Sequence, residues 1–276
     1  MQFRTAVSLH EYERMTTREL RASFLIDKLF TPGAIDLTYW EIDRTIIGSA
    51  VPLKTPLELP APDELKSEYF CEGRELGIFN IGSPGVVSVD GKDFEMGARG
   101  CLYVGRGSRE VTFASETAEE PARFYLVSYR AHAAHPTAYV SEEGANRVEL
   151  GERETANRRV IHQAIHEGGV QSCQLVMGFT KLEVGSVWNT MPPHTHSRRS
   201  EVYLYFDVPS EAAVFHFAGP GNETRHLVVQ NGQAVLSPGW SIHAGCGTCN
   251  YSFVWAMGGE NRRFSDMDGI AIADLR

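Results

Sequence analysis

The feature that most constrains the fold is a series of short β-forming segments that glycine residues interrupt at short intervals. Residues 86–89 favour a strand and run into Asp90-Gly91, a pair that favours a tight hairpin turn, before a second segment at residues 92–96. Glycines recur throughout this region, at Gly82, Gly85, Gly91, Gly97, Gly100, Gly105 and Gly107. Short strands that turn this often are typical of an antiparallel sandwich or barrel, so the sequence predicts an all-β fold.

The second half of the chain repeats this style. Strand-like stretches occur at residues 175–180, 201–208, 213–217, 225–229, 233–236 and 251–257. Residues 100–107 resemble residues 233–240, since each is a short strand that ends in a glycine turn. We therefore expect a duplicated β-barrel. A polar stretch at residues 142–157 indicates the junction, which gives an N-terminal domain at residues 1–150 and a C-terminal domain at residues 151–276.

One short helix is expected near the N-terminus. Thr16 and Glu19 have the spacing of a capping box, and Leu20 and Phe24 follow at helical spacing. Beyond this helix the sequence turns to strands.

The composition excludes several classes of function. Hydrophobic residues make up 42% of the 276 residues, and 35 acidic residues against 26 basic ones give a net charge of −9. Because nucleic-acid affinity rests on phosphate neutralisation by basic residues, we expect no nucleic-acid partner. No run approaches the roughly 20 apolar residues of a membrane span, so no membrane association is expected. Five irregularly spaced cysteines and the lack of a secretory signal favour reduced thiols in the cytoplasm.

The densest group of chemically active residues lies at residues 193–203. Residues two apart on a strand share a face, so His194 and His196 can present both imidazoles to one point inside a barrel. A bend over the polar residues that follow would bring Glu201 to the same point, and His243 can supply a fourth ligand from a later strand. Two or three imidazoles with one carboxylate suit zinc, iron, manganese or nickel. No histidine lies between His10 and His132, so we expect the N-terminal domain to lack such a site.

These residues resemble the motifs of the cupin family. The first motif, a glycine followed by His-x-His and then Glu, matches Gly185, His194, His196 and Glu201. The second matches Pro238, Gly239 and His243, with Asn250 in the last place. Gly185 lies further from His194 than usual, and Pro238 and Gly239 are adjacent, so the strand lengths depart from the family pattern. The resemblance implies a bicupin: two double-stranded β-helix, or jelly-roll, barrels.

Longer stretches resemble one family within the cupins, the 5-keto-4-deoxyuronate isomerases. The similar stretches are residues 74–82, 102–105, 188–196, 198–203, 223–226, 240–243 and 264–268. The resemblance implies a zinc enzyme of pectin and polyuronide breakdown with a homohexameric assembly. It further implies an aldose–ketose isomerisation of 5-dehydro-4-deoxy-D-glucuronate to 3-deoxy-D-glycero-2,5-hexodiulosonate. The lack of histidines between His10 and His132 predicts one ion per chain. A different divalent ion remains an alternative to zinc.

Such an isomerase needs a group that moves protons and a cation for the substrate carboxylate. Tyr203 shares the inward face of its strand with Glu201, as Tyr205 does, and Lys181 and Glu183 precede the motif. For the carboxylate a guanidinium is preferred. Arg225 is the first candidate and Arg198 the second, with Arg199 beside it. Each of these side chains has a purely structural role as its alternative.

Three other functions fit the same metal pattern. The 5-deoxyglucuronate isomerases of inositol catabolism are related and share it. Cupins also include Fe(II) dioxygenases, because a fold does not fix a function. A sugar-sensing cupin is disfavoured, since no DNA-binding segment is attached.

Overall fold

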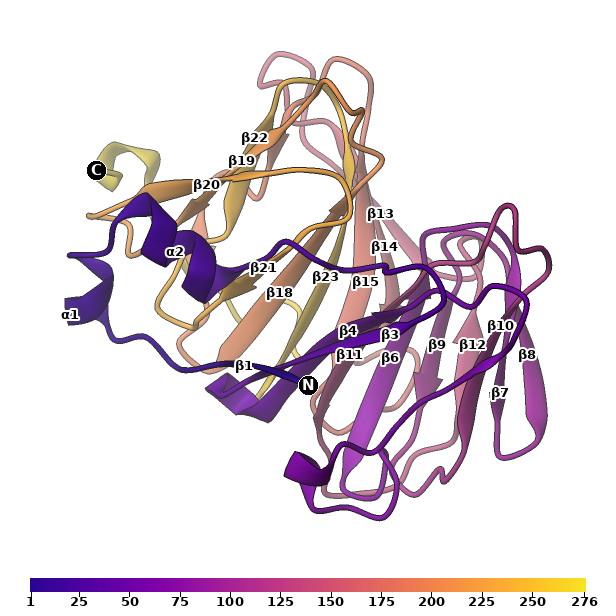
Figure 1. The fold of residues 1–276 in the computed structure, drawn as a ribbon. Coiled ribbons are helices and arrows are strands. Elements are labelled where there is room, and N and C mark those ends of the chain that lie inside the picture. Colours follow the sequence, from indigo (N-terminus) through magenta and orange to yellow (C-terminus); the bar gives the residue numbers. More distant parts are fainter. The chain divides into compact units, whose positions relative to one another are not determined.

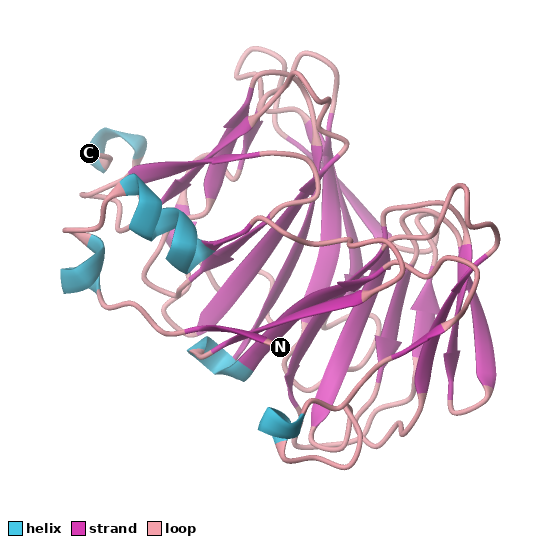
Figure 2. Cartoon of the chain, viewed as in Figure 1, coloured by secondary structure: helices cyan, strands magenta, loops and turns pink.

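The computed structural model describes residues 1–276 and consists mainly of strands, with few helices (Figure 2). The α-helices are α1 (Leu9–Tyr12) and α2 (Thr17–Phe24), and short 3-10 turns lie at Ile42–Arg44, Asp63–Leu65 and Ile272–Asp274. The capping box at the start of α2 is confirmed, because the Thr16 hydroxyl accepts from the Glu19 N–H while the Glu19 carboxylate accepts from the Thr16 N–H. The expectation of an all-β fold is also confirmed.

The chain forms two compact units that do not divide at one point. Unit 1 comprises residues 1–4, 28–145 and 164–176, and unit 2 comprises residues 5–27, 146–163 and 177–276. A junction at residue 150 therefore misplaces three segments, residues 5–27, 146–150 and 164–176. The polar stretch expected to be a linker also contains a strand, β13 (Asn146–Leu150), that pairs with the following strand.

Unit 1 contains a seven-stranded and a four-stranded sheet (Figure 1). The larger sheet, in spatial order, is β1 (Gln2–Arg4), β3 (Ile35–Trp40), β4 (Thr45–Ala50), β11 (Phe124–Arg130), β6 (Arg74–Asn80), β9 (Cys101–Val104) and β12 (Ala138–Val140). The smaller sheet is β5 (Leu57–Glu58), β10 (Val111–Ser115), β7 (Gly85–Val89) and β8 (Lys92–Met96). The β7–β8 hairpin confirms the predicted turn, with positive φ at both Asp90 and Gly91.

Unit 2 also contains a seven-stranded and a four-stranded sheet, although its first edge strand β13 pairs antiparallel where β1 pairs parallel. Its seven-stranded sheet, in spatial order, is β13, β14 (Arg159–Ile165), β15 (Val176–Leu182), β23 (Ser252–Gly259), β18 (Arg199–Phe206), β21 (Ala234–Ser237) and β2 (Leu25–Ile26). Its four-stranded sheet is β16 (Trp188–Asn189), β22 (Ala244–Gly247), β19 (Val214–Ala218) and β20 (Arg225–Val229). Strands β9 and β21, whose sequences resemble each other, hold the same place in the two orders. A short extra pair, β17 (His194–Thr195) and β24 (Asp268–Gly269), belongs to unit 2 alone.

The N-terminal segment joins unit 2 because its apolar side chains are buried there. Leu25 pairs with Val235, which places β2 at the edge of the large sheet. The rings of Tyr12 and Phe24 pack against Trp240, and the Tyr12 hydroxyl donates to the carbonyl of Ala218. Burial of these large side chains contributes on the order of 2 kcal/mol each, enough to hold a segment with little structure of its own.

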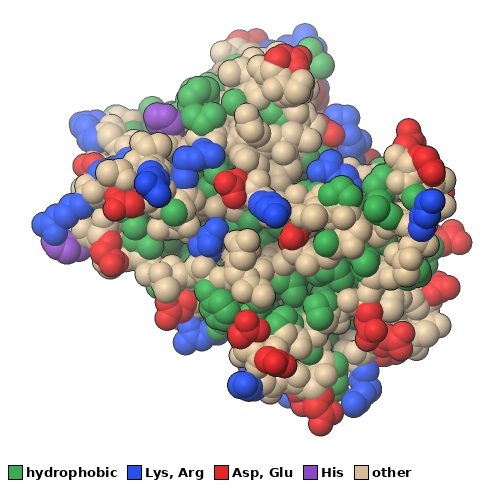
Figure 3. All heavy atoms as spheres, in the orientation of Figure 1, with side chains coloured by type: hydrophobic (Ala, Val, Ile, Leu, Met, Phe, Trp, Pro, Cys, Tyr) green, Lys and Arg blue, Asp and Glu red, His purple; other side chains and the backbone are tan.

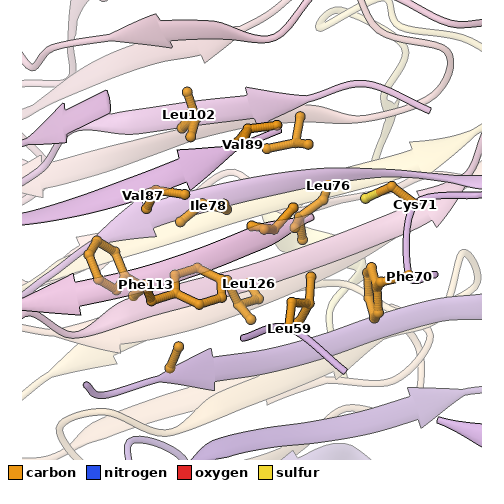
Figure 4. Packing of buried hydrophobic residues seen from close by; sticks show 14 of the residues in the cluster. Leu59, Phe70, Cys71, Leu76, Ile78, Val87, Val89, Leu102, Phe113 and Leu126 are labelled. Carbon is orange, nitrogen blue, oxygen red and sulfur yellow. The ribbon is translucent and has the colours of Figure 1, made fainter. Parts of the chain in front are cut away.

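The two units differ in what fills the space between their sheets. In unit 1 this space is apolar, and Figure 4 shows Leu76, Ile78, Val87 and Phe113 packed together from β6, β7 and β10. In unit 2 the interior is lined partly by polar aromatic and imidazole side chains, among them Tyr203, Tyr205, His216 and Tyr251. An apolar core in unit 1 and buried hydroxyl and imidazole groups in unit 2 indicate that chemistry belongs to unit 2.

On the face drawn in Figure 3, acidic and basic side chains are interspersed rather than gathered into one basic area. No helix has both the length and the apolar character that crossing a membrane requires.

Candidate metal centre

The structure brings together the four side chains that the sequence singled out. The candidate ligand atoms of His194, His196, Glu201 and His243 all lie within 4.8 Å of one another. The His194 Nε2 is 3.2 Å from the His196 Nε2 and 3.0 Å from the His243 Nε2. The Glu201 Oε2 lies 3.0 Å from the His196 Nε2 and 3.1 Å from the His243 Nε2. His196, Glu201 and His243 expose 3%, 3% and 1% of their surface, so little water reaches the group.

The two ligands of the His-x-His motif are held by the segment that contains β24. His194 pairs with Gly269 in the β17–β24 ladder. The Ser197 hydroxyl donates to the Asp268 carboxylate at 2.8 Å, and the Arg198 guanidinium forms ion pairs with Asp266 and Asp268. These bonds fix the bend that the sequence predicted between His196 and Glu201.

The Pro238-Gly239 turn supports the same bend from the other side. The His196 N–H donates to the Gly239 carbonyl at 3.1 Å. A Cβ atom on residue 239 would lie 2.6 Å from the carbonyl oxygen of His196, so only glycine permits this close approach. The adjacency of Pro238 and Gly239, which departs from the usual cupin spacing, therefore still positions the His196 backbone.

A backbone carbonyl orients the imidazole of His196. Its Nδ1 lies 2.6 Å from the carbonyl oxygen of Asp266, which can only accept, so the Nδ1–H donates and the Nε2 keeps a lone pair. The Arg199 guanidinium donates to the same carbonyl at 2.7 Å. Such a bond behind a histidine fixes the ring and raises its basicity as a ligand.

The electrostatics of the group favour a bound cation. Burial, assisted by the neighbouring His243 and His196, lowers the pKa of His194 to about 3, and burial likewise holds the pKa of His243 well below its usual value. Neutral imidazoles place their lone pairs beside one another and beside the carboxylate of Glu201. Three nitrogen donors and one oxygen donor suit zinc and similar divalent ions. The donor set thus fits a divalent metal, with a net charge of about +1 once it is bound.

The group opens on a cavity of about 250 Å³. The cavity is lined by Leu150, Arg159, Ile161, Thr180, Thr190, Met191, Pro192, His194, His196, Glu201, Tyr203, Phe253, Trp255, Met257, Phe264 and Met267. Tyr203 lies next to the candidate ligands, and its hydroxyl is 3.0 Å from the Thr190 Oγ1. Burial raises the pKa of Tyr203 well above its usual value, so this side chain keeps its proton and can donate it in a hydrogen bond.

Three lining residues with polar side chains, Arg159, Thr180 and Thr190, were not expected from the sequence. Arg158 and Arg159 are adjacent, and only the pairing of β14 decides which one faces inward. Every residue of β14 after Arg159 is buried, so no alternation of polar and apolar residues marks the inner face. Thr190 lies in the loop after β16, where the sequence offers no periodic signal.

The other candidates for a proton-transfer residue lie outside this lining. Lys181 is exposed on β15, and the Glu183 carboxylate pairs with Arg158 at 3.1 Å. Tyr205 is buried, with its hydroxyl 2.7 Å from the Nδ1 of His216. Of the four, only Tyr203 reaches the cavity.

The arginines expected to bind a carboxylate have structural partners instead. The Arg225 guanidinium donates to the backbone carbonyls of Met15 and Glu13, and it lies over the ring of Tyr12. Arg225 therefore links the N-terminal segment to β20. Arg198 forms ion pairs with Asp266 and Asp268, and Arg199 donates to the carbonyls of residues 263 and 266. None of the three lines the cavity, which corrects the expectation for Arg225 and Arg198.

The fold is shared with solved structures of low sequence identity. An IolB-like protein from Salmonella typhimurium superimposes with a TM-score of 0.72 at 13% identity, covering 90% of this chain and 96% of that one. A mutant form of Bacillus subtilis oxalate decarboxylase gives a TM-score of 0.60 at 10% identity, covering 87% of this chain and 78% of that one. These likenesses confirm the cupin-like fold.

Comparison with known sequences gives a closer relationship. Residues 27–271 match the model of the KduI/IolB family. A protein of Halalkalibacterium halodurans named 4-deoxy-L-threo-5-hexosulose-uronate ketol-isomerase is 53% identical over the full length of both chains. A protein of the same name from Formosa agariphila is 55% identical, over 99% of this chain and 98% of that one. With its fold, its ligand cluster and these matches in agreement, the chain belongs to the KduI/IolB family.

Proposed function

We propose that this chain is a metal-dependent ketol-isomerase that converts 5-dehydro-4-deoxy-D-glucuronate to 3-deoxy-D-glycero-2,5-hexodiulosonate. The observation that carries the proposal is the convergence of three imidazoles and one carboxylate at the wall of a small, largely apolar cavity. Full-length relatives at about half identity bear the name of this ketol-isomerase, and that agreement supports the choice of substrate. The reaction belongs to the breakdown of pectin and other polyuronides.

His194, His196, Glu201 and His243 are the proposed ligands of one ion per chain. Zinc is the proposed ion, because its usual ligands are imidazole and carboxylate in fourfold coordination, with another divalent ion as the alternative. When bound, the ion would act as a Lewis acid toward the carbonyl and hydroxyl oxygens of the substrate. The apolar walls formed by Phe253, Trp255 and Met257 exclude bulk water and so strengthen electrostatic interactions inside the cavity.

Tyr203 is the residue proposed to hold a proton at a substrate oxygen. Apart from the proposed ligands, Tyr203 and Arg159 are the only ionisable side chains in the lining. An aldose–ketose isomerisation moves the carbonyl from C1 to C2 and leaves a hydroxyl at C1. The Tyr203 hydroxyl, oriented by Thr190, can donate to the oxygen on which negative charge develops. It also keeps this proton at neutral pH, since burial raises its pKa.

Two further parts of the proposal rest on the sequence, the assembly on the family resemblance and the location on the composition. We propose that the protein assembles as a homohexamer and that it works in the cytoplasm. All five cysteines are free thiols in the structure, which agrees with a reducing compartment.

A second candidate function lies in the same family. The IolB-like structure from Salmonella superimposes over most of the chain, so 5-deoxyglucuronate isomerisation is the alternative substrate assignment. Incubation of the purified protein with each of the two uronates, followed by product analysis by NMR, distinguishes the two. Formation of the 2,5-diketo acid from the 4-deoxy substrate supports the proposal. Turnover of 5-deoxyglucuronate alone would contradict the proposal and assign 5-deoxyglucuronate isomerisation instead. Oxygen consumption with either acid would indicate a dioxygenase.

A further inference from the structure

The cavity contains one permanent cation, and its position was not evident from the sequence. Arg159 is the only lysine or arginine among the lining residues, while three candidate metal ligands line the same cavity. A ligand in this space can therefore contact the metal group and a guanidinium at the same time.

The hydrogen bonds of Arg159 leave one edge of its guanidinium unused. Both bonds of Arg159 come from Nη1, one to the Asn157 carbonyl at 2.9 Å and one to the Asn157 side-chain oxygen at 2.6 Å. Neither acceptor carries a charge, and no carboxylate pairs with this guanidinium. The Nε–H and the two N–H groups of Nη2 donate to no protein atom. These two nitrogens form the edge of the guanidinium that binds a carboxylate through two parallel hydrogen bonds.

Asn157 holds the Arg159 guanidinium in place. The Asn157 side chain donates to the Met191 carbonyl at 2.9 Å, so it links Arg159 to another part of the cavity wall. Gly151 leaves room for this arrangement, because a Cβ there would lie 2.0 Å from the Asn157 carbonyl oxygen and 3.1 Å from the Arg159 Nη1. Gly151 also has a φ of +77°, which favours glycine. A side chain fixed in this way loses little entropy when it binds a ligand.

We infer that Arg159 binds the C6 carboxylate of the substrate and thereby selects uronates over neutral sugars. This inference rests on the proposed function. In a 4-deoxy-5-ketouronate the carboxylate and the isomerising C1–C2 pair are at opposite ends of a six-carbon chain. One end then meets Arg159 and the other the metal group, while the C4 methylene faces apolar wall residues such as Ile161 and Phe253. This assigns to Arg159 the role that the sequence suggested for Arg225.

The kinetic test compares Arg159→Gln with Arg158→Gln. Arg158 is the adjacent residue, but its guanidinium pairs with Glu183 outside the cavity, so it serves as the matched control. Each variant is assayed with the uronate and with the corresponding uronamide, whose C6 group is neutral. Loss of a bidentate charged contact should lower kcat/KM for the uronate by about 30-fold or more, and the uronamide should lose far less. Arg159→Lys should recover only part of the lost kcat/KM, because a lysine ammonium cannot form two parallel hydrogen bonds with a carboxylate.

A binding measurement makes the test independent of turnover. The borohydride-reduced substrate keeps the carboxylate and cannot isomerise, and it is titrated calorimetrically into metal-loaded and chelator-treated protein. Arg159→Gln should weaken its binding by about 30-fold in both forms, with metal content unchanged. Equal losses on uronate and uronamide, or unchanged affinity for the reduced acid, would overturn the inference. If the wild-type protein fails to isomerise the uronate, the proposed function fails, and the calorimetry still decides the role of Arg159.

Discussion

Leu76 occupies in unit 1 the position that Glu201 occupies in unit 2. Leu76 pairs with Ser128 on β11 and with Val104 on β9, while Glu201 pairs with Met257 on β23 and with Ser237 on β21. Val104 and Ser237 are the last residues of strands that hold the same place in the two sheets. The side chain of Leu76 is fully buried in the apolar core of unit 1. An aliphatic side chain therefore fills the point at which unit 2 presents its carboxylate.

The first prediction is that the wild-type protein binds one divalent ion per chain and that His243→Ala binds essentially none. Four ligands act together, so removal of one buried imidazole should cost most of the affinity and the activity with it. Metal analysis by mass spectrometry after dialysis, together with kcat, measures both. Two tightly bound ions per wild-type chain, or full metal content in His243→Ala, would contradict the ligand assignment.

The second prediction concerns the hydroxyl of Tyr203. Tyr203→Phe removes one hydrogen-bond donor from the cavity while the four candidate ligands remain. We expect kcat to fall about 10- to 100-fold with metal content unchanged, since a donor to developing charge contributes a few kcal/mol at most. Tyr251→Phe is the control, because its hydroxyl donates to the Asn189 side chain and does not line the cavity. A Tyr203→Phe enzyme with the wild-type kcat would exclude the proposed role.

The third prediction is a pH dependence of stability that arises from His216. This side chain is fully buried, its Nε2 has no hydrogen-bond partner, and burial lowers its pKa to about 3. His216 takes up a proton near pH 6.5 in the unfolded chain but not in the folded protein. Its contribution to the free energy of unfolding is therefore present above that pH and is lost as the pH falls. Between pH 8 and pH 5 the loss should be about 2 kcal/mol.

His216→Asn tests this pH dependence, because asparagine can keep the bond to the Tyr205 hydroxyl but does not titrate. Urea unfolding of metal-free wild-type and variant protein at both pH values gives the comparison, since the other histidines contribute equally to each. The variant should lose about 2 kcal/mol less than the wild type on acidification. Parallel losses in the two proteins would show that His216 is protonated in the folded state.

The fourth prediction concerns the carboxylate of Glu75. This buried group accepts from the Tyr103 hydroxyl and from the backbone N–H groups of Cys173, Gln174 and Leu175, at 2.6 to 2.9 Å. Glu75→Gln places an amide donor among these donors and should destabilise unit 1 by about 3 kcal/mol. Hydrogen exchange at residues 173–175 and the thermal midpoint measure the effect. Glu95→Gln, an exposed site on β8, should leave both unchanged.

The features that the sequence predicted correctly depend on neighbouring residues. The hairpin at Asp90-Gly91 and the capping box at Thr16 are decided within four residues of the chain. The His194 and His196 pair follows from the alternation of side chains along one extended segment. His243 could be added because a proline and a glycine precede it, as in the second cupin motif, although the spacing differs. In each case the information lies in a short stretch.

The features that the sequence did not predict depend on pairing between distant segments. Arg159 rather than Arg158 faces the cavity because of how β14 pairs within its sheet, and both residues are arginine. The sequence favours Arg225 as a carboxylate-binding residue, but its partners are the carbonyls of Glu13 and Met15, far away along the chain. Strand β2 is two residues long and carries no strand signal of its own, so only its pairing with β21 reveals it.

The membership of residues 5–27 in unit 2 has a consequence for how the chain is made. These residues leave the ribosome before the rest of unit 2, and β2 cannot pair until Val235 has been synthesised. At usual rates of translation this interval lasts on the order of tens of seconds, during which Tyr12 and Phe24 lack the Trp240 ring that covers them. The barrel of unit 2 can therefore close only after Val235 has been synthesised, whereas most of unit 1 is available to fold well before.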